Sequence, residues 1–103
     1  MLRDVQAEIG ELVQSHRVVL FMKGNKLMPQ CGFSASAVQI VGSYTKDFHT
    51  VNVLQDPQVR QGIKDFSNWP TIPQAYVDGE FLGGSDILRE LHESGELAAI
   101  FGA

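Results

Sequence analysis

The chemistry that this sequence can support centres on one cysteine, Cys31, which precedes an apolar pattern with helical spacing. A thiol at a helix N-terminus faces unpaired backbone N–H groups and the positive end of the helix dipole, and both stabilise the thiolate. Lys23 ends the preceding strand-like segment, and a cation there lowers the thiol pKa further. We therefore predict an acidic, reactive Cys31. The alternative, a small buried cysteine, is disfavoured by the adjacent Gly32 and the preceding loop.

A single thiol also limits the redox and metal chemistry of the chain. One cysteine cannot form an internal disulfide, which is typical of a reducing compartment. A tetrahedral thiolate site needs four ligands, whereas the sequence offers Cys31 and three scattered histidines, His16, His49 and His92. Any metal site must therefore take ligands from another molecule. A cysteine hydrolase is not indicated, because no histidine lies in a motif near the thiol.

The spacing of apolar residues predicts the elements that position this thiol. A stripe from Leu2 to Val13 indicates a first helix that ends near Ser15. Further helices are expected over 33–44, 57–66, 86–94 and 96–101, with strands over 18–22, 49–54, 74–77 and 80–83. Strand–helix–strand order implies a parallel pair, and a hairpin implies an antiparallel one. The fold class is therefore α/β, with a four-stranded mixed sheet flanked by helices.

Local signals fix several boundaries of these elements. Asp56 followed by Pro57 is typical of a helix N-cap and first helical position. The pair 78–79, Asp-Gly, suits a two-residue type I′ hairpin turn. Ser85 or Asp86 is expected to cap the helix that follows, and Gly95 to end it.

Length and charge exclude several classes of protein. With 103 residues the chain fits one domain over 1–103, and no apolar run is long enough to cross a bilayer. A net charge of −4 without a cluster of Lys and Arg argues against nucleic-acid binding. The N-terminus resembles neither a secretory signal nor a transit peptide. We expect no membrane or nucleic-acid partner.

Four motifs, taken together, resemble those of a monothiol glutaredoxin of the single-domain type. They are MKG at 22–24, CGFS at 31–34, NWPTIPQ at 68–74 and GGSD at 83–86. The resemblance covers nearly the whole chain and implies the thioredoxin fold with an added N-terminal helix. It also implies a cis peptide bond before Pro73, beside Cys31, which leaves the Ile72 backbone free to pair with the cysteine part of glutathione.

The resemblance also implies which residues bind the two carboxylates of glutathione. Lys23 and Arg60 match the cations that hold the glycine carboxylate, and Lys64, one turn after Arg60, can assist. Each cation has a plainer interpretation as a solvated surface residue. Trp69 is equally compatible with core or turn packing.

The γ-glutamyl end of glutathione is expected to meet the start of the helix after Gly83-Gly84. Backbone N–H groups at Ser85 suit its carboxylate, and the Asp86 side chain suits its ammonium group. Gly83-Gly84 is also sufficient as a plain turn. Ser85 departs from many monothiol glutaredoxins, which carry a cysteine there, so a regulatory disulfide at this position is absent.

Two functions follow from one thiol, because Ser34 stands where dithiol glutaredoxins have the resolving cysteine. The resemblance implies a carrier of 2Fe-2S clusters for iron–sulfur protein assembly. Cys31 and the glutathione thiol from each of two subunits would ligate the cluster. The expected partners are a second copy when the cluster is bound, BolA-type proteins and apo iron–sulfur acceptors.

The alternative is a glutathione-dependent oxidoreductase that removes glutathione from proteins through the Cys31 thiolate. The loop at 23–30, KGNKLMPQ, resembles the monothiol class and indicates at most weak activity of this kind. The expected location is an intracellular reducing compartment: the cytoplasm in a bacterium, or the mitochondrial matrix or a plastid in a eukaryote.

Overall fold

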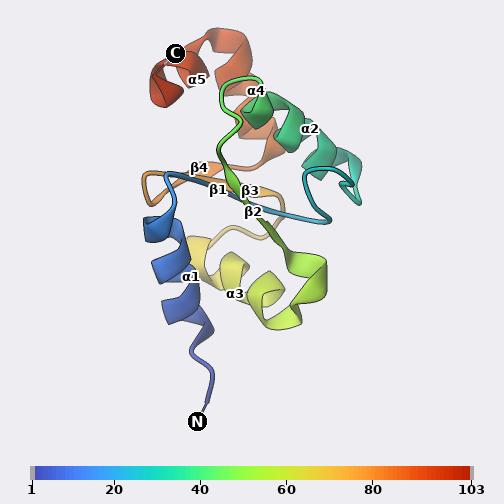
Figure 1. Ribbon diagram of the computed structural model, residues 1–103, viewed down its shortest axis with the longest axis vertical. Coiled ribbons are helices and arrows are strands. Elements are labelled where there is room, and N and C mark those ends of the chain that lie inside the picture. The colour runs from blue at the N-terminus through green and yellow to red at the C-terminus, as the bar shows by residue number, and fades with distance from the viewer. Residues whose placement is uncertain (1, 103) are drawn as a thin grey trace.

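The computed structural model describes residues 2–102 and has a four-stranded mixed sheet with helices on both faces (Figure 1). The strand order is β2-β1-β3-β4, in which β1 pairs with β2 in parallel and with β3 antiparallel. In chain order the elements are α1 (Val5–Ser15), β1 (Val18–Met22), α2 (Gly32–Gly42), β2 (His49–Asn52), η1 (Val53–Gln55), α3 (Pro57–Ser67), β3 (Gln74–Val77), β4 (Glu80–Gly83), α4 (Ser85–Ser94) and α5 (Glu96–Phe101). The predicted α/β class, mixed sheet and N-terminal helix are confirmed.

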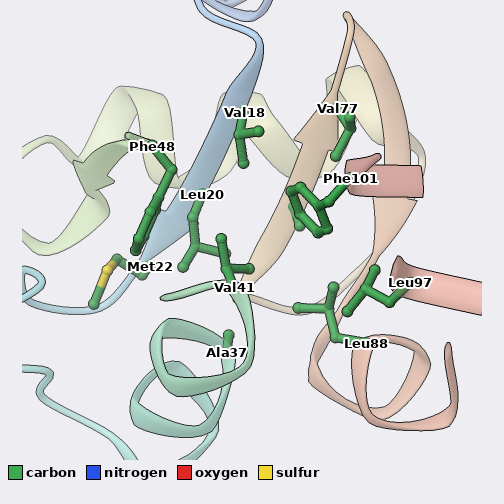
Figure 2. Packing of buried hydrophobic residues seen from close by; sticks show 11 residues of the cluster. Val18, Leu20, Met22, Ala37, Val41, Phe48, Val77, Leu88, Leu97 and Phe101 are labelled. Carbon is green, nitrogen blue, oxygen red and sulfur yellow. The ribbon is translucent and has the colours of Figure 1, made fainter. Parts of the chain in front are cut away.

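The central strand β1 explains why residues 18–22 are apolar without interruption. All five of its side chains are buried, because helices cover both faces of the sheet. Val18, Leu20 and Met22 point toward α2 and α4 (Figure 2), whereas Val19 and Phe21 pack on the side of α1 and α3. One strand therefore joins two hydrophobic clusters.

Several predicted boundary signals are confirmed. Asp56 is the N-cap of α3, where its side chain accepts a hydrogen bond from the Val59 N–H, and Pro57 is the first helical residue. In the hairpin turn both Asp78 and Gly79 have positive φ, 53° and 81°, as a type I′ turn requires. Gly95 ends α4 in the left-handed conformation.

The first two helices differ at their ends from the prediction. α1 begins at Val5 with Asp4 as N-cap, and Leu2 lies before it with 96% of its surface exposed. Leu2 was therefore wrongly placed in the apolar stripe. The predicted helix to Tyr44 ends at Gly42, and Phe33 in its first turn is 61% exposed rather than part of the core.

The second strand and the fourth helix also begin or end differently. β2 stops at Asn52, because the Asn52 side chain accepts a hydrogen bond from the Leu54 N–H and starts the 3-10 turn η1. The predicted cap at Ser85 or Asp86 is wrong. Gly84 is the N-cap of α4 and supplies no side-chain hydrogen bond. Within residues 2–102 no helix has the length and apolar composition needed to span a membrane.

The packing predicts a large difference between two leucines. Leu88 is fully buried in the cluster beneath α2, whereas Leu27 is 93% exposed in a loop. Leu88→Ala should therefore lower the free energy of unfolding by about 2–5 kcal/mol, since it leaves a cavity as well as losing apolar burial. Leu27→Ala should change it by less than about 0.5 kcal/mol. Urea unfolding of both variants tests this, and equal effects would contradict the assigned core.

Candidate functional site

Cys31 is the N-cap of α2, at the point where the chain returns from the loop after β1. Its backbone is extended, with φ −153° and ψ 155°, and its sulfur accepts a hydrogen bond from the Ser34 N–H at 3.3 Å. The thiol is partly exposed. Cys31 therefore holds a helix N-terminus with its sulfur, as the sequence predicted from its position.

The side chain of Ser34 links this sulfur to the end of β1. Ser34 is fully buried, and its Oγ lies 3.3 Å from the Cys31 Sγ. The same Oγ accepts a hydrogen bond from the backbone N–H of Lys23 at 3.0 Å. A hydroxyl can accept and donate at the same time, so while the Ser34 Oγ accepts from that N–H, its hydrogen can be donated to the sulfur when the thiol is ionised.

These contacts make the thiol acidic. Partial burial is the largest single effect and raises the pKa of Cys31, whereas hydrogen bonds from the Ser34 hydroxyl and N–H lower it. The Phe33 N–H and the charge of Lys23 lower the pKa further, and together these contacts outweigh burial. The net pKa of the thiol is below the ordinary cysteine value, and the thiolate fraction at neutral pH is correspondingly raised.

A cleft of about 390 Å³ opens between α3, the segment before β3 and the start of α4. It brings together all of the predicted ligand residues other than the cysteine: Lys23, Arg60, Lys64, Ile72, Pro73, Ser85 and Asp86. Cys31 is not itself a lining residue. Lys23 and Phe33, which both line the cleft, are the residues that connect it to the thiol.

The loop at the centre of the cleft is held by one buried amide. The bond between Ile72 and Pro73 is cis, as the resemblance implied. Gln74 is fully buried, and its Nε2 donates to the carbonyl oxygens of Trp69 and Thr71, both at 3.1 Å. Within residues 2–102 the N–H and C=O of Ile72 form no hydrogen bond, so both are free to pair with a ligand backbone.

The cleft concentrates positive charge that has no internal partner. Among the described residues, Lys23, Arg60 and Lys64 form no ion pair with a carboxylate. The arginines elsewhere do pair: Arg3 with Glu8 and Asp56, Arg17 with Asp78, and Arg89 with Asp86. In a chain with net charge −4, cations left unpaired around one cleft indicate an anionic ligand.

The opposite end of the cleft is the N-terminus of α4. Gly84, the N-cap of α4, has no side chain that could accept a hydrogen bond from the first N–H groups of this helix. Ser85 is buried at this end, whereas the Asp86 side chain is 82% exposed and 3.8 Å from Arg89. A Cβ at Gly84 would lie 3.2 Å from the Pro73 carbonyl oxygen, so a larger residue would crowd the loop.

Some residues of the site were missed or left open by the sequence. Trp69, 41% exposed, lines the cleft, as do Phe33 and Thr71. Ser34 was considered only as a missing cysteine. The sequence signal for the role of Ser34 is its position three residues after the N-cap, because a side chain at that position contacts the cap residue.

The histidines lie elsewhere. His16 and His49 stack with ring centroids 4.2 Å apart, and the His92 Nδ1 is 2.6 Å from the Tyr44 hydroxyl. None of the three lines the cleft. Within the described residues no group of three His, Cys, Asp or Glu side chains could hold a metal ion.

Comparisons with known proteins agree on one family. The glutaredoxin family model matches residues 18–82. The chain is 57% identical over 94 residues to an uncharacterized monothiol glutaredoxin, ycf64-like, of Synechocystis, a match that covers 91% of this chain and 88% of that protein. It is 47% identical over 98 residues to the mitochondrial monothiol glutaredoxin-5 of Saccharomyces cerevisiae, covering 92% of this chain and 65% of the yeast protein.

Two further relatives are a mitochondrial protein and a protein of solved structure. Glutaredoxin-related protein 5 of Danio rerio, a mitochondrial protein, is 53% identical over 93 residues, and the match covers 89% of this chain and 60% of that protein. The solution structure of reduced poplar apo GrxS14 superposes with a TM-score of 0.81 at 52% identity, covering 92% of this chain and 87% of the poplar chain. The thioredoxin fold of these relatives is therefore the fold described above.

The Ser34 contacts predict how the thiol responds to substitution. Ser34→Ala removes the hydroxyl that stabilises the Cys31 thiolate, so the thiol pKa should rise toward the ordinary value for cysteine. Ser36→Ala is the matched control on the same helix and should leave this pKa unchanged. Thiolate absorbance and the rate of alkylation against pH measure it. An unchanged pKa in Ser34→Ala would contradict the role of this hydroxyl.

Proposed function

The chain belongs to the glutaredoxin family, in its monothiol type, and we propose that it binds glutathione and carries a 2Fe-2S cluster for iron–sulfur protein assembly. The observation that carries the proposal is the juxtaposition of one acidic thiol with a cleft of unpaired cations. Glutathione supplies what the chain lacks at this place: two carboxylates and a second thiol.

The cleft has a group for each part of glutathione. Lys23 and Arg60, with Lys64 beside them, would bind the glycine carboxylate, and Arg60 can do so with two parallel hydrogen bonds. The free N–H and C=O of Ile72 would pair with the central cysteine of the tripeptide in the manner of a β-strand.

The γ-glutamyl group would meet the start of α4. The uncapped N–H groups at Ser85 suit its carboxylate, because a helix N-terminus attracts anions. The exposed carboxylate of Asp86 suits its ammonium group. With both ends of the tripeptide held in this way, the thiol of its central cysteine would be directed toward Cys31.

The donor set fits a cluster that is shared between two subunits. A 2Fe-2S cluster takes four thiolates, whereas each chain supplies only Cys31. Cys31 and one glutathione thiol from each of two subunits complete the set. The cluster is cargo here rather than a resident group, because half of its ligands belong to small molecules that can dissociate.

The same reasoning names the partners and location that we propose. The cluster-bound form is a homodimer, and the recipients are apo iron–sulfur proteins, with BolA-type proteins as further partners. The mitochondrial relatives support a reducing compartment inside the cell. The compartment would be the cytoplasm in a bacterium, and the mitochondrial matrix or a plastid in a eukaryote.

A second function is supported by the lowered thiol pKa. The Cys31 thiolate would attack the glutathione sulfur of a glutathionylated protein, which releases the protein thiolate and leaves glutathione on Cys31. A second glutathione thiolate would then attack that disulfide, release Cys31 and form glutathione disulfide. The products are the reduced protein and one glutathione disulfide, and one cysteine suffices throughout.

Anaerobic reconstitution separates the two functions. Wild type with iron, sulfide and glutathione should give a coloured dimer with about one glutathione per subunit, and Cys31→Ser should give a colourless monomer because it lacks the thiolate ligand. Visible spectroscopy, glutathione quantitation and gel filtration measure this. A colourless wild-type monomer that still turns over glutathionylated protein would overturn the carrier function in favour of the enzymatic one.

The cations of the cleft predict an effect on glutathione affinity that can be measured without the 2Fe-2S cluster. Arg60→Gln should weaken binding of glutathione by about tenfold, the equivalent of ~1.4 kcal/mol, because it removes one charge-assisted contact to the glycine carboxylate. Trp69, the one tryptophan of the sequence, lines the cleft and reports binding by its fluorescence. Arg17→Gln, whose arginine pairs with Asp78 outside the cleft, is the control and should bind as wild type does.

A further inference from the structure

A second hollow, separate from the cleft, lies between α2 and the segment that leads into β2. It has a volume of about 400 Å³ and is lined by Lys26, Val38, Gln39, Gly42, Ser43, Lys46 and Phe48. We refer to these residues as the Lys26–Phe48 groove. No residue lines both this groove and the cleft, and no carboxylate lines the groove. Val38 and Phe48 offer apolar contact in the groove, and Lys26 and Lys46 supply positive charge.

The loop that carries Lys26 is held in place by its own hydrogen bonds. The Asn25 Oδ1 accepts hydrogen bonds from the N–H groups of Leu27 at 3.0 Å and Met28 at 2.9 Å. The Gly24 N–H donates to the Asn52 Oδ1 at 3.0 Å, which ties the loop to the end of β2. Lys26 is therefore presented from a defined turn.

Lys26 in turn sits over the aromatic floor of the groove. Its Nζ lies 4.1 Å from the centroid of the Phe48 ring, within the range of a cation–π contact. Phe48 belongs to the hydrophobic cluster beneath α2 and lies beside Met22 (Figure 2). The charge is thus fixed next to an apolar surface that is anchored in the core.

The two lysines of the groove have no acidic partner. Within residues 2–102 neither Lys26 nor Lys46 forms an ion pair, although the chain carries 12 acidic residues against 8 basic ones. Asp47 adjoins Lys46 in sequence but does not line the groove. The two lysines therefore stay unpaired in a chain with more acidic than basic residues, because no acidic side chain lies close enough to pair with them.

We propose that the Lys26–Phe48 groove docks an acidic, amphipathic segment of a partner protein. Two carboxylates of that segment pair with Lys26 and Lys46, and an apolar side chain between them packs on Val38 and on the edge of Phe48, which is 7% exposed. This surface goes beyond the proposed function, which uses the cleft alone. The argument for an acidic occupant is charge complementarity.

A second copy of this chain is a poorer occupant. A two-fold interface centred on the groove would place Lys26 and Lys46 of one protomer against the same lysines of the other. Glutathione bound in the cleft would leave the charges of Lys26 and Lys46 unneutralised, because neither lysine lines the cleft.

The test is an NMR titration of ¹⁵N-labelled protein with a synthetic probe. The probe is a 12-residue peptide with Leu at positions i and i+4 and Asp or Glu at its other positions, and the matched peptide has Lys at each acidic position. The acidic probe should shift amides of 38–48 and of Lys26, with an affinity that falls as salt rises. The basic peptide should cause no such shifts.

Charge variants with the same net charge make the test specific. Lys26→Gln with Lys46→Gln should weaken binding of the acidic probe at least fivefold, since each exposed charge pair contributes a few-fold. Arg17→Gln with Arg89→Gln removes equal charge outside the groove and should bind like wild type. Equal weakening in both variants, shifts confined to the cleft, or no binding at millimolar probe would overturn the proposal.

A glutathione titration on the same samples keeps the two proposals apart. The Lys26→Gln/Lys46→Gln variant should bind glutathione as wild type does, because neither lysine lines the cleft. If wild type binds the acidic probe in the groove but not glutathione, the groove proposal stands and the proposed function fails. Binding of glutathione without the acidic probe gives the reverse result.

Discussion

The structure depends on the burial of one strand, β1, on both of its faces. Its side chains alternate between two hydrophobic clusters, so the same five residues hold α2 and α4 on one side and α1 and α3 on the other. The strand ends at Met22, and the N–H of the next residue, Lys23, is bonded to the Ser34 side chain in α2. Because the core fixes the strand and this hydrogen bond fixes the helix start, the position of Cys31 follows from the packing.

Local charge and total charge have opposite signs in this molecule. The chain as a whole is acidic, yet the cations of the cleft and of the groove have no carboxylate partner among the described residues. Exposed charges separated by more than about 8 Å are largely screened at physiological salt. An anion in the cleft therefore responds mainly to Lys23, Arg60 and Lys64, and to Asp86 at the start of α4, and little to the acidic residues elsewhere.

Much of the fold could be predicted from the sequence, because periodicity reports which face of an element is buried. The prediction from periodicity failed where a single contact decides where a helix or strand begins or ends. Asn52 ends β2 with its side chain, and Leu2 lies outside the helix that Asp4 caps. The convergence of α3, the segment before β3 and α4 on one cleft is tertiary and came from the resemblance. The Lys26–Phe48 groove has no local motif, since its residues meet only after folding.

The contacts of Cys31 bear on both proposed functions of the thiol. Metal ligation requires the thiolate, and each hydrogen bond to the sulfur favours that form. The same stabilisation lowers nucleophilicity, because the reactivity of a thiolate falls as its pKa falls, with a Brønsted coefficient of about 0.4–0.5. With a coefficient below one, the gain in thiolate fraction outweighs this loss until the pKa approaches the ambient pH. The Ser34 contacts therefore serve the proposed cluster ligation and the proposed thiol exchange alike, and what separates the two is whether a second subunit and glutathione complete the four thiolates.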